Sequence, residues 1–533
     1  MASSVGHHRH LGHHHEPAGR RAHPVAAGQL LGRQHGPGGT ARAPELAIQN
    51  QLHQYGGRLS MRSSYNSRET GGSRRGDLQE ARSRIRAGRE ASVLVVVLWI
   101  TAGLTALILY FAASMGLELR ASANRASDLA AGQAIEGAAR YVGWALANFA
   151  TNGMMTTNAQ FVCEAVPIGE SRVWILGRNP AASETGLNQL VFNLQDESGK
   201  LNLNRANSNA LTMLPGMTSE LAATVVDWRS TNGSMSLGYA SLGYQAKWSP
   251  FETVDELRLI EGMTLDHLFG DDRNLNGILD PEERSLTGSL FSTPGLLDTT
   301  TVFSREPNFH ADGTLLTNVN TRAQIQGLLE SSFGTGRSRE ILTRLGFPQG
   351  GGPGGQGGAA ATPNFPSLLR FYLSSGLSQD DFERIAPELC VTTNTYTYGR
   401  VNLNTASATV LSALMVGAGL SQTAAEGAAS SLVRYREQNA TSLNSIAWMV
   451  AALGRDHQAV TTLAGRDLLT TRSFQYGADV VAVGPLGRGY RRVKFIFDIS
   501  DGVPKIIFRQ DLSRLGWALG DRIRQQIAQS VDQ

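Results

Sequence analysis

The sequence predicts an α+β protein in which one long amino-terminal helix precedes a small antiparallel sheet, with a large α-helical region inserted into that sheet. Three observations predict this fold class. An uncharged apolar run near residue 100 continues into helix-forming sequence, strand patterns are confined to 172–203 and 474–512, and a repeated helical motif lies between them. With 533 residues and 41% hydrophobic content, the chain is long enough to form several packed domains.

The first 90 residues differ in composition from the rest of the chain. They hold 14 arginines, 6 acidic residues and nine of the twelve histidines, so their net charge is +8 and the remaining residues carry −5. Because apolar periodicity is missing, we predict a disordered cytoplasmic leader over residues 1–90. Metal binding by the run HHRHLGHHH and a translation start at Met61 are the alternatives left open. The positive charge lies in this tail, so a globally basic nucleic-acid binder is not expected.

Residues 91–117, ASVLVVVLWITAGLTALILYFAASMGL, carry no charged side chain. A helix of about 20 apolar residues crosses a bilayer, so this run is long enough for one membrane span. A buried core helix and a secretory signal peptide are the alternatives, and the length of the run and the arginines before it favour the span. Those arginines predict a cytoplasmic amino terminus and a body on the other side of the membrane. One helix is predicted to continue over 92–150.

Strand patterns flank the predicted helical insertion. RVWILGR and LVFNLQDESGKLNL precede it, with DESG as a turn, and FQYGADVVAVG, YRRVKFIFDIS and PKIIFRQDL follow it. Inside the insertion, GKLNLNRANSNALTML at 199 aligns with GRVNLNTASATVLSAL at 399, and GTLLTNVNTRAQIQGLL at 313 is a weaker copy. Each copy places a capping residue before a helix, which predicts two related helical modules.

Composition and pattern together predict the domain organisation of the chain. In order, we predict the leader 1–90, a membrane-spanning and extended helix 91–150, the first part of the α/β domain 151–204, a first helical module with a metal loop 205–346, a Gly-rich surface loop 347–364, a second helical module 365–470, and strands and a helix that complete the α/β domain 471–533.

The stretch DDRNLNGILDPEE, residues 271–283, fits the calcium-loop pattern D-x-[DN]-x-[DN]-G-x5-E. Gly277 permits the sharp turn, and Leu279 at the eighth place is predicted to pack inward. Pro281 follows the ninth place, so a regular exit helix that starts inside the loop is not expected. An Asn/Asp-rich surface turn is the alternative to calcium. The predicted ligands of one structural calcium ion are Asp272, Asn274, Asn276, the carbonyl of Ile278, Asp280 through water, and Glu283.

The remaining chemistry-bearing residues form no catalytic pattern. His267, His310 and His457 are scattered without metal-ligand spacing, and no GxSxG motif is present, so enzyme activity is not expected. Cys163 and Cys390 are the two cysteines, and the sequence leaves open whether they form a disulfide or stay free.

The combination of motifs resembles the minor pseudopilin K of bacterial type II secretion systems, the GspK family. The resemblance covers about residues 89–533 and rests on VLVVVLW, LQDESGKLNLNRANSNALTMLPGM, DWR, PFETVDELRLIEGMT and RVNLNTASATVL. It implies a pilin-type helix and sheet with an inserted SAM-like helical domain, an inner-membrane anchor with a periplasmic body, and no catalytic activity. It also implies a place at the tip of a short pseudopilus with two other minor pseudopilins, acting in protein export across the outer membrane.

The resemblance further implies processing by a prepilin peptidase, whose substrates carry a leader ending in glycine just before the apolar stretch. Cleavage after Gly88 makes Arg89 the new terminus. Cleavage after Ala91, which the place of Trp99 favours, makes Ser92 the first residue.

The fifth residue after cleavage is Val93 in the first frame and Val96 in the second. Neither frame supplies the glutamate that major pilins place there, whose buried carboxylate would pair with the terminal amine of a neighbouring subunit. A subunit without that carboxylate suits a tip position.

A membrane-anchored external DNA receptor is the competing function, because the LPGM turn at 214 resembles the hairpin of helix-hairpin-helix modules. Its backbone amides would hold phosphate, but the following TSELAATVVD contains no Lys or Arg and the body carries net negative charge. We therefore expect no nucleic-acid partner.

Overall fold

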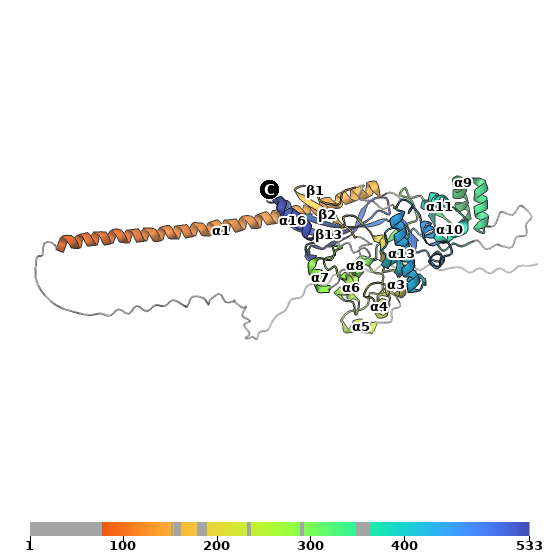
Figure 1. Cartoon of the computed structure of the whole chain (residues 1–533), viewed down its shortest axis with the longest axis horizontal. Coiled ribbons are helices and arrows are strands. Elements are labelled where there is room, and N and C mark those ends of the chain that lie inside the picture. The colour runs from red at the N-terminus through yellow and green to blue at the C-terminus, as the bar shows by residue number, and fades with distance from the viewer. Residues whose placement is uncertain are drawn as a thin grey trace, which may run out of the picture. The chain divides into compact units, whose positions relative to one another are not determined.

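The computed structural model describes residues 77–150, 153, 161–178, 189–231, 236–287, 293–347 and 363–531. The chain forms two units, residues 1–98 and 99–533. The predicted leader before residue 77 and the predicted Gly-rich loop over 348–362 lie outside the described residues. The fold class predicted from the sequence is confirmed: a long amino-terminal helix and a small antiparallel sheet form an α+β protein (Figure 1).

Helix α1 spans Asp77–Phe149 as one helix of 73 residues, so the predicted helix over 92–150 exists and begins earlier than expected. The predicted disorder of the leader is therefore wrong over 77–90, which continue the same helix. From Val93 onward it is long and apolar enough to cross a membrane, and its side chains are exposed there. Further along, one face of the helix becomes buried at three- and four-residue spacing, as an amphipathic helix requires. The small side chains on this face allow close packing. Its buried residues include Ala131, Ala134, Ile135, Ala138, Ala139, Val142, Ala145 and Leu146.

The main sheet has six antiparallel strands in the order β1-β2-β12-β13-β14, with β3 beside β12. The three carboxyl-terminal strands predicted from alternation are confirmed. The DESG turn is a short 3-10 helix, η1 (Glu197–Gly199), which is capped by a hydrogen bond from the Ser198 N–H to the side chain of Asp196. The large insertion separates β3 from β12 in sequence. The strands are β1 (Val166–Ile168), β2 (Ser171–Leu176), β3 (Gln195–Asp196), β12 (Gln475–Val483), β13 (Tyr490–Asp498) and β14 (Lys505–Asp511).

The two faces of the sheet carry different side chains. One face packs its apolar side chains against the buried stripe of α1. On the other face, a smaller apolar cluster packs Trp174 and Val481 against the segment that begins α16 (Gly520–Val531). The same face also presents charged residues of β12 and β13, including Asp479 and Arg492, which are both buried. Charged residues buried on one sheet face need partners, and the insertion supplies some of them.

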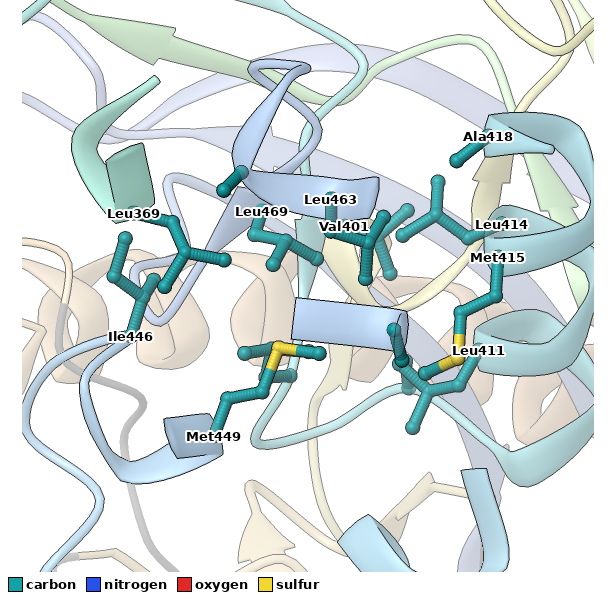
Figure 2. Packing of buried hydrophobic residues seen from close by; sticks show 14 of the residues in the cluster. Leu369, Val401, Leu411, Leu414, Met415, Ala418, Ile446, Met449, Leu463 and Leu469 are labelled. Carbon is teal, nitrogen blue, oxygen red and sulfur yellow. The ribbon is translucent and has the colours of Figure 1, made fainter. Parts of the chain in front are cut away.

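The insertion is mainly helical and is built on one continuous hydrophobic core that runs from Leu201 to Leu469. Figure 2 shows part of this core, where side chains of α10, α12, α14 and α15 pack around Val401 and Leu469. The helices are α3 (Ser208–Leu211), α4 (Ser219–Arg229), α5 (Ser236–Ser241), α6 (Leu265–Phe269), α7 (Pro281–Thr287), α8 (Leu296–Thr299), α9 (Arg322–Arg344), α10 (Leu368–Ser375), α11 (Gln379–Ile385), α12 (Ala408–Ala418), α13 (Gln422–Gln438), α14 (Trp448–Leu453) and α15 (Gln458–Ala464). Short 3-10 helices are η2 (Val254–Leu259), η3 (Ala386–Glu388), η4 (Pro485–Gly487) and η5 (Ser513–Leu515).

The three copies of the Asn motif share one local structure. In each copy the side chain of the first Asn accepts a hydrogen bond from the backbone N–H of the second, at 2.9 Å. The side-chain amide of the second Asn also hydrogen-bonds to a backbone segment that is distant in sequence. Asn204, for example, donates to the carbonyl of Phe251 and accepts from its N–H. Each motif strand also pairs in parallel with a later short strand, so the copy at 313 is built like the other two. The short strands are β4 (Leu201–Asn202), β5 (Thr300–Thr301), β6 (Arg305–Pro307), β7 (Thr317–Asn318), β8 (Leu389–Cys390), β9 (Tyr396–Tyr398), β10 (Val401–Asn402) and β11 (Leu469–Thr470).

Both cysteines are free and buried, which decides the alternative left open by the sequence. Cys163 belongs to the core beneath α1, whereas Cys390 contacts the carbonyl of Leu316. Burial raises the pKa of Cys163 to about 12 and also raises the pKa of Cys390.

We expect neither thiol to react with iodoacetamide in the folded protein at pH 8, because the thiolate is the nucleophile. After unfolding without reductant, mass spectrometry is expected to find both alkylated, and an unalkylated, bridged pair would contradict this arrangement.

Candidate metal centre

The predicted calcium loop connects α6 to α7. Leu279 is buried as predicted, and Gly277 has φ +86°, a conformation that glycine adopts without strain. The expectation that no helix starts inside the loop is wrong, because α7 begins at Pro281, the tenth place. Proline is favoured at the first position of a helix, where its missing N–H removes no intrahelical hydrogen bond.

Asp272, the first predicted ligand, is buried, and backbone N–H groups of the loop surround its carboxylate. Its Oδ1 accepts a hydrogen bond from the backbone N–H of Asn276 at 3.0 Å, and its Oδ2 accepts one from Gly277 at 2.6 Å. Asn276 is also buried, and its Oδ1 accepts from the N–H of Ile278 at 2.9 Å. These local contacts hold the side chains of Asp272 and Asn276 against the backbone of the loop.

The other two predicted carboxylate ligands, Asp280 and Glu283, accept hydrogen bonds from within the loop. Glu283 accepts from the backbone N–H groups of Arg273 at 2.9 Å, Asn274 at 3.2 Å and Asp280 at 2.9 Å. Asp280 Oδ2 accepts from the side-chain amides of Asn274 at 2.7 Å and Asn276 at 3.1 Å. The structure therefore brings all of the predicted side-chain ligands into one hydrogen-bonded loop.

Two observations fit a hard cation such as calcium in this loop. Asn274 Oδ1 is buried and has no hydrogen-bond partner, although its Nδ2 is bonded, so one amide oxygen is available as a ligand. Burial raises the pKa values of Asp272, Asp280 and Glu283, because the ionised carboxylates are removed from water without full compensation by positive charge. Oxygen donors of this kind are those that calcium prefers.

The carboxylates do not by themselves form a metal cluster. Within the described ranges, no group of three or more His, Cys, Asp or Glu side chains is arranged to hold a metal ion. The amide and backbone oxygens of Asn274, Asn276 and Ile278 are therefore needed to complete a ligand set. Calcium stays a prediction here.

The residues that anchor the loop to the sheet were missed by sequence reasoning. Arg492 on β13 donates hydrogen bonds to the backbone carbonyls of Asn274 and Leu275, and it pairs with Asp479 on β12. Arg178, just after β2, donates to the carbonyl of Leu275 at 2.5 Å. Positions more than 90 residues apart in the chain carry no local signal of this contact, so only the fold reveals it.

Arg178 is itself held by an acidic partner from the insertion. Its Nε donates to Asp298 in α8 at 2.9 Å, and Asn274 Nδ2 reaches the carbonyl of Trp517 at 3.4 Å. The loop is thus fixed both to the sheet and to the segment before α16.

The residues predicted for leader processing lie in the helical backbone of α1: Gly88, Arg89, Ala91 and Ser92. Val93 and Val96, the two alternatives for the fifth place, have exposed side chains in the same helix.

The scattered histidines have ordinary structural contacts. His267 caps the start of α6 together with Thr264, His310 contacts Glu388 at 2.9 Å, and His457 caps α15. The LPGM turn at 214 connects α3 to α4, as a hairpin between two helices.

Comparison with models of known protein families finds no match, and no curated protein matches the sequence. Among solved structures, the chain is similar to a chain in the crystal structure of the GspK-GspI-GspJ complex from the type 2 secretion system of enterotoxigenic Escherichia coli. The two chains are 10% identical, the TM-score is 0.36, and the match covers 72% of this chain and 95% of that chain.

Proposed function

We propose that this protein is a non-enzymatic minor pseudopilin of a type II secretion system, anchored in the inner membrane by α1 with its body in the periplasm. It would act at the tip of the pseudopilus together with two companion minor pseudopilins, counterparts of GspI and GspJ, after cleavage by a prepilin peptidase.

The main observation in support of this proposal is that α1 has two parts with different surroundings. Its first part is an exposed apolar helix long enough to span a membrane, and its second part packs against a small antiparallel sheet. A helix of this kind supplies both an anchor and a surface for lateral packing with partner helices. The large insertion between β3 and β12 broadens the body. A broad body at one end of a helical filament would block further addition of subunits, which supports a tip position.

Calcium would stabilise this body through the loop after α6. The ligands would be Asp272, Asn274, Asn276, the Ile278 carbonyl, Asp280 and Glu283. The ion would supply the positive charge that the buried carboxylates lack. Because Arg178 and Arg492 hold the loop against the sheet, the ion would stiffen the connection between the insertion and the sheet.

Asp280→Asn gives the cleanest test of calcium binding. The amide oxygen of the variant can still accept both hydrogen bonds from Asn274 and Asn276, so its unfolding midpoint in chelator should stay close to that of the wild type. Calcium at about 100 times its dissociation constant is expected to stabilise the wild type by about 2.7 kcal/mol. The variant should need more calcium for the same rise in midpoint. Asp271→Asn is the matched control, because Asp271 accepts from the Thr293 N–H and is not a predicted ligand. A wild-type midpoint that calcium does not move would exclude a stabilising ion.

Assembly is tested by a pull-down of the chain with the two companion minor pseudopilins, in calcium and in chelator, with duplex DNA as a separate arm. A ternary complex without DNA binding is the expected result. Deletion of the protein should abolish export of secreted proteins in the same cells. Normal secretion after deletion, or DNA retention that falls steeply with salt, would reject the proposal in favour of a receptor role.

A further inference from the structure

A cavity of about 160 Å³ lies between the main sheet and the first part of the helical insertion. Strands β12, β13 and β14 contribute one side of it, and η2, α6 and α8 contribute the other. The volume is close to that of an engineered cavity of about 150 Å³ that holds a benzene molecule. The space therefore fits a ligand of about six heavy atoms.

The strand register places three polar side chains in a row across the cavity. Lys494 on β13 lies directly opposite Asp479 on β12 and Gln510 on β14. Residues paired in this way point to the same face of a sheet. All three line the cavity, with Lys494 in the middle of the row.

Most charges that line the cavity are already paired. Arg178 pairs with Asp298 at 2.9 Å, and Arg258 pairs with Asp255 at 3.1 Å. The Asp479 carboxylate pairs with Arg492, which lies two residues before Lys494 on β13. The carboxylates of these pairs are therefore compensated by guanidinium groups.

Two cations of the lining lack such a partner. Among the described residues, neither the Lys494 ammonium nor the Arg514 guanidinium makes a hydrogen bond or an ion pair within 4 Å. Lys494 is partly buried, and burial together with the charge of Lys200 lowers its pKa to about 8, although the carboxylates of Glu197, Asp298 and Asp479 oppose this. The ammonium form therefore still predominates at neutral pH. A partly buried cation without a direct hydrogen-bonded partner gains from a counter-ion that enters the cavity.

The rest of the lining limits the kind of anion. Arg514 is exposed at the rim, as is Asp511, whose carboxylate accepts a hydrogen bond from the Ser513 N–H. Apolar side chains cover much of the remaining wall: Phe269, Leu275, Leu297, Leu512 and Leu515. An anion with a short hydrocarbon stem would satisfy both the cations and the apolar wall.

We propose that this cavity binds a carboxylate group on a short hydrocarbon stem, with Lys494 inside the cavity and Arg514 at the rim as its two cationic partners. The carboxylate belongs either to a free short-chain acid or to an acidic side chain of a bound protein. The shared chemistry is a charge-assisted contact to the ammonium and the guanidinium. This proposal is independent of the role in secretion and of calcium.

The test measures reductive methylation of individual lysines by mass spectrometry, on the full chain in detergent at pH 8. Butyrate is the probe, and butyramide is its neutral analogue of the same shape. We expect butyrate to slow methylation of Lys494 by about tenfold at saturation while butyramide leaves it unchanged. Lys247 and Lys505, which pair with Glu256 and Asp501, are internal controls that should not respond.

Arg514→Gln is the variant that tests the second partner. Arg514 is exposed and unpaired, so the variant is expected to fold, and it should need about tenfold more butyrate for half-protection, as the loss of one charged hydrogen bond predicts.

In a second readout, butyrate should raise the unfolding midpoint of the wild type but not of Lys494→Met. N-acetylglutamate α-amide distinguishes the sources: protection by it indicates a protein side chain, and protection by butyrate alone indicates a free acid. Equal protection by butyramide, an unchanged half-protection concentration in Arg514→Gln, or no effect of either acid in both readouts would overturn the proposal.

Discussion

Replacing Glu306 with glutamine is expected to destabilise the folded body by about 3–5 kcal/mol, the usual cost of breaking a buried ion pair. Glu306 lies on β6 and is buried, and its carboxylate accepts from Arg400 Nη1 at 2.7 Å and Arg472 Nε at 2.6 Å. Arg400 also pairs with Asp467 at 2.6 Å. Glutamine keeps the volume but offers one acceptor oxygen, and its amide hydrogens face the second guanidinium. One of the two guanidinium groups therefore loses a charged acceptor, and the charge that offset both arginines is removed.

The pH dependence of this effect follows from the pKa of Glu306. Burial raises that pKa, but the charges of Arg472 and Arg400 outweigh burial and hold it at about 2, below the ordinary 4.5. A depressed carboxyl pKa gives stability that is fully present above about pH 4.5 and is lost as the pH falls toward 2. The difference in unfolding free energy between wild type and Glu306→Gln should therefore shrink over that range.

Denaturant unfolding at a series of pH values measures both effects. Glu388→Gln is the matched control, because the Glu388 side chain is 45% exposed and, among the described residues, its carboxylate contacts no titratable side chain except His310. Exposed pairs of this kind contribute about 0–1 kcal/mol. A Glu306→Gln variant as stable as Glu388→Gln would mean that the two arginines are solvated without the carboxylate.

Local sequence patterns were sufficient for the elements whose contacts are periodic. The alternation in YRRVKFIFDIS predicts β13 because its apolar side chains face α1, and the 27-residue uncharged run predicts the first part of α1. The hydrogen-bonded shape of the loop over 272–283 was also predictable, since the contacts of Asp272 and Glu283 lie within about ten residues of the chain. Short-range hydrogen bonds leave a spacing that can be read from the sequence.

The contacts that join distant segments were not predictable in this way. Nothing near Glu306 indicates Arg400 or Arg472, and nothing near Asn274 indicates Arg492, because these pairs form only after the insertion folds against the sheet. The helix start at Pro281 differs from the prediction for another reason: proline breaks a helix in its interior, but the first turn of a helix tolerates it.

Arg492→Met is expected to have the second large effect, because it removes the contact between the sheet and the predicted calcium loop. Arg492 is fully buried, and its guanidinium pairs with both oxygens of Asp479, at 2.9 and 2.6 Å. Methionine fills similar space but leaves the Asp479 carboxylate buried without its partner, at a cost of about 3–5 kcal/mol. The carbonyls of Asn274 and Leu275 also lose a donor.

The double variant Asp479→Asn with Arg492→Met separates these two contributions. Removing the unpaired charge should restore part of the stability lost in Arg492→Met, so the double variant is expected to be more stable than the single one. Both stability effects are predicted whether or not calcium binds. If the single and double variants unfold at the same denaturant concentration, the buried charge of Asp479 is not the source of the loss.

Calcium affinity gives the independent readout of the same contact. Groups that orient a metal loop from outside typically change metal affinity by about 10- to 100-fold when replaced, so the double variant should bind calcium at least about tenfold more weakly than the wild type. The lost positive charge of Arg492 should not offset this in the double variant, because the negative charge of its partner Asp479 is removed as well. Arg273→Met is the control, since Arg273 lies inside the loop but its side chain is 55% exposed and pairs with Asp266. Equal calcium affinity in Arg273→Met and in the double variant would mean that the loop holds its shape without the sheet. Weaker binding confined to the Arg492 variants would mean that the sheet sets the geometry of the loop.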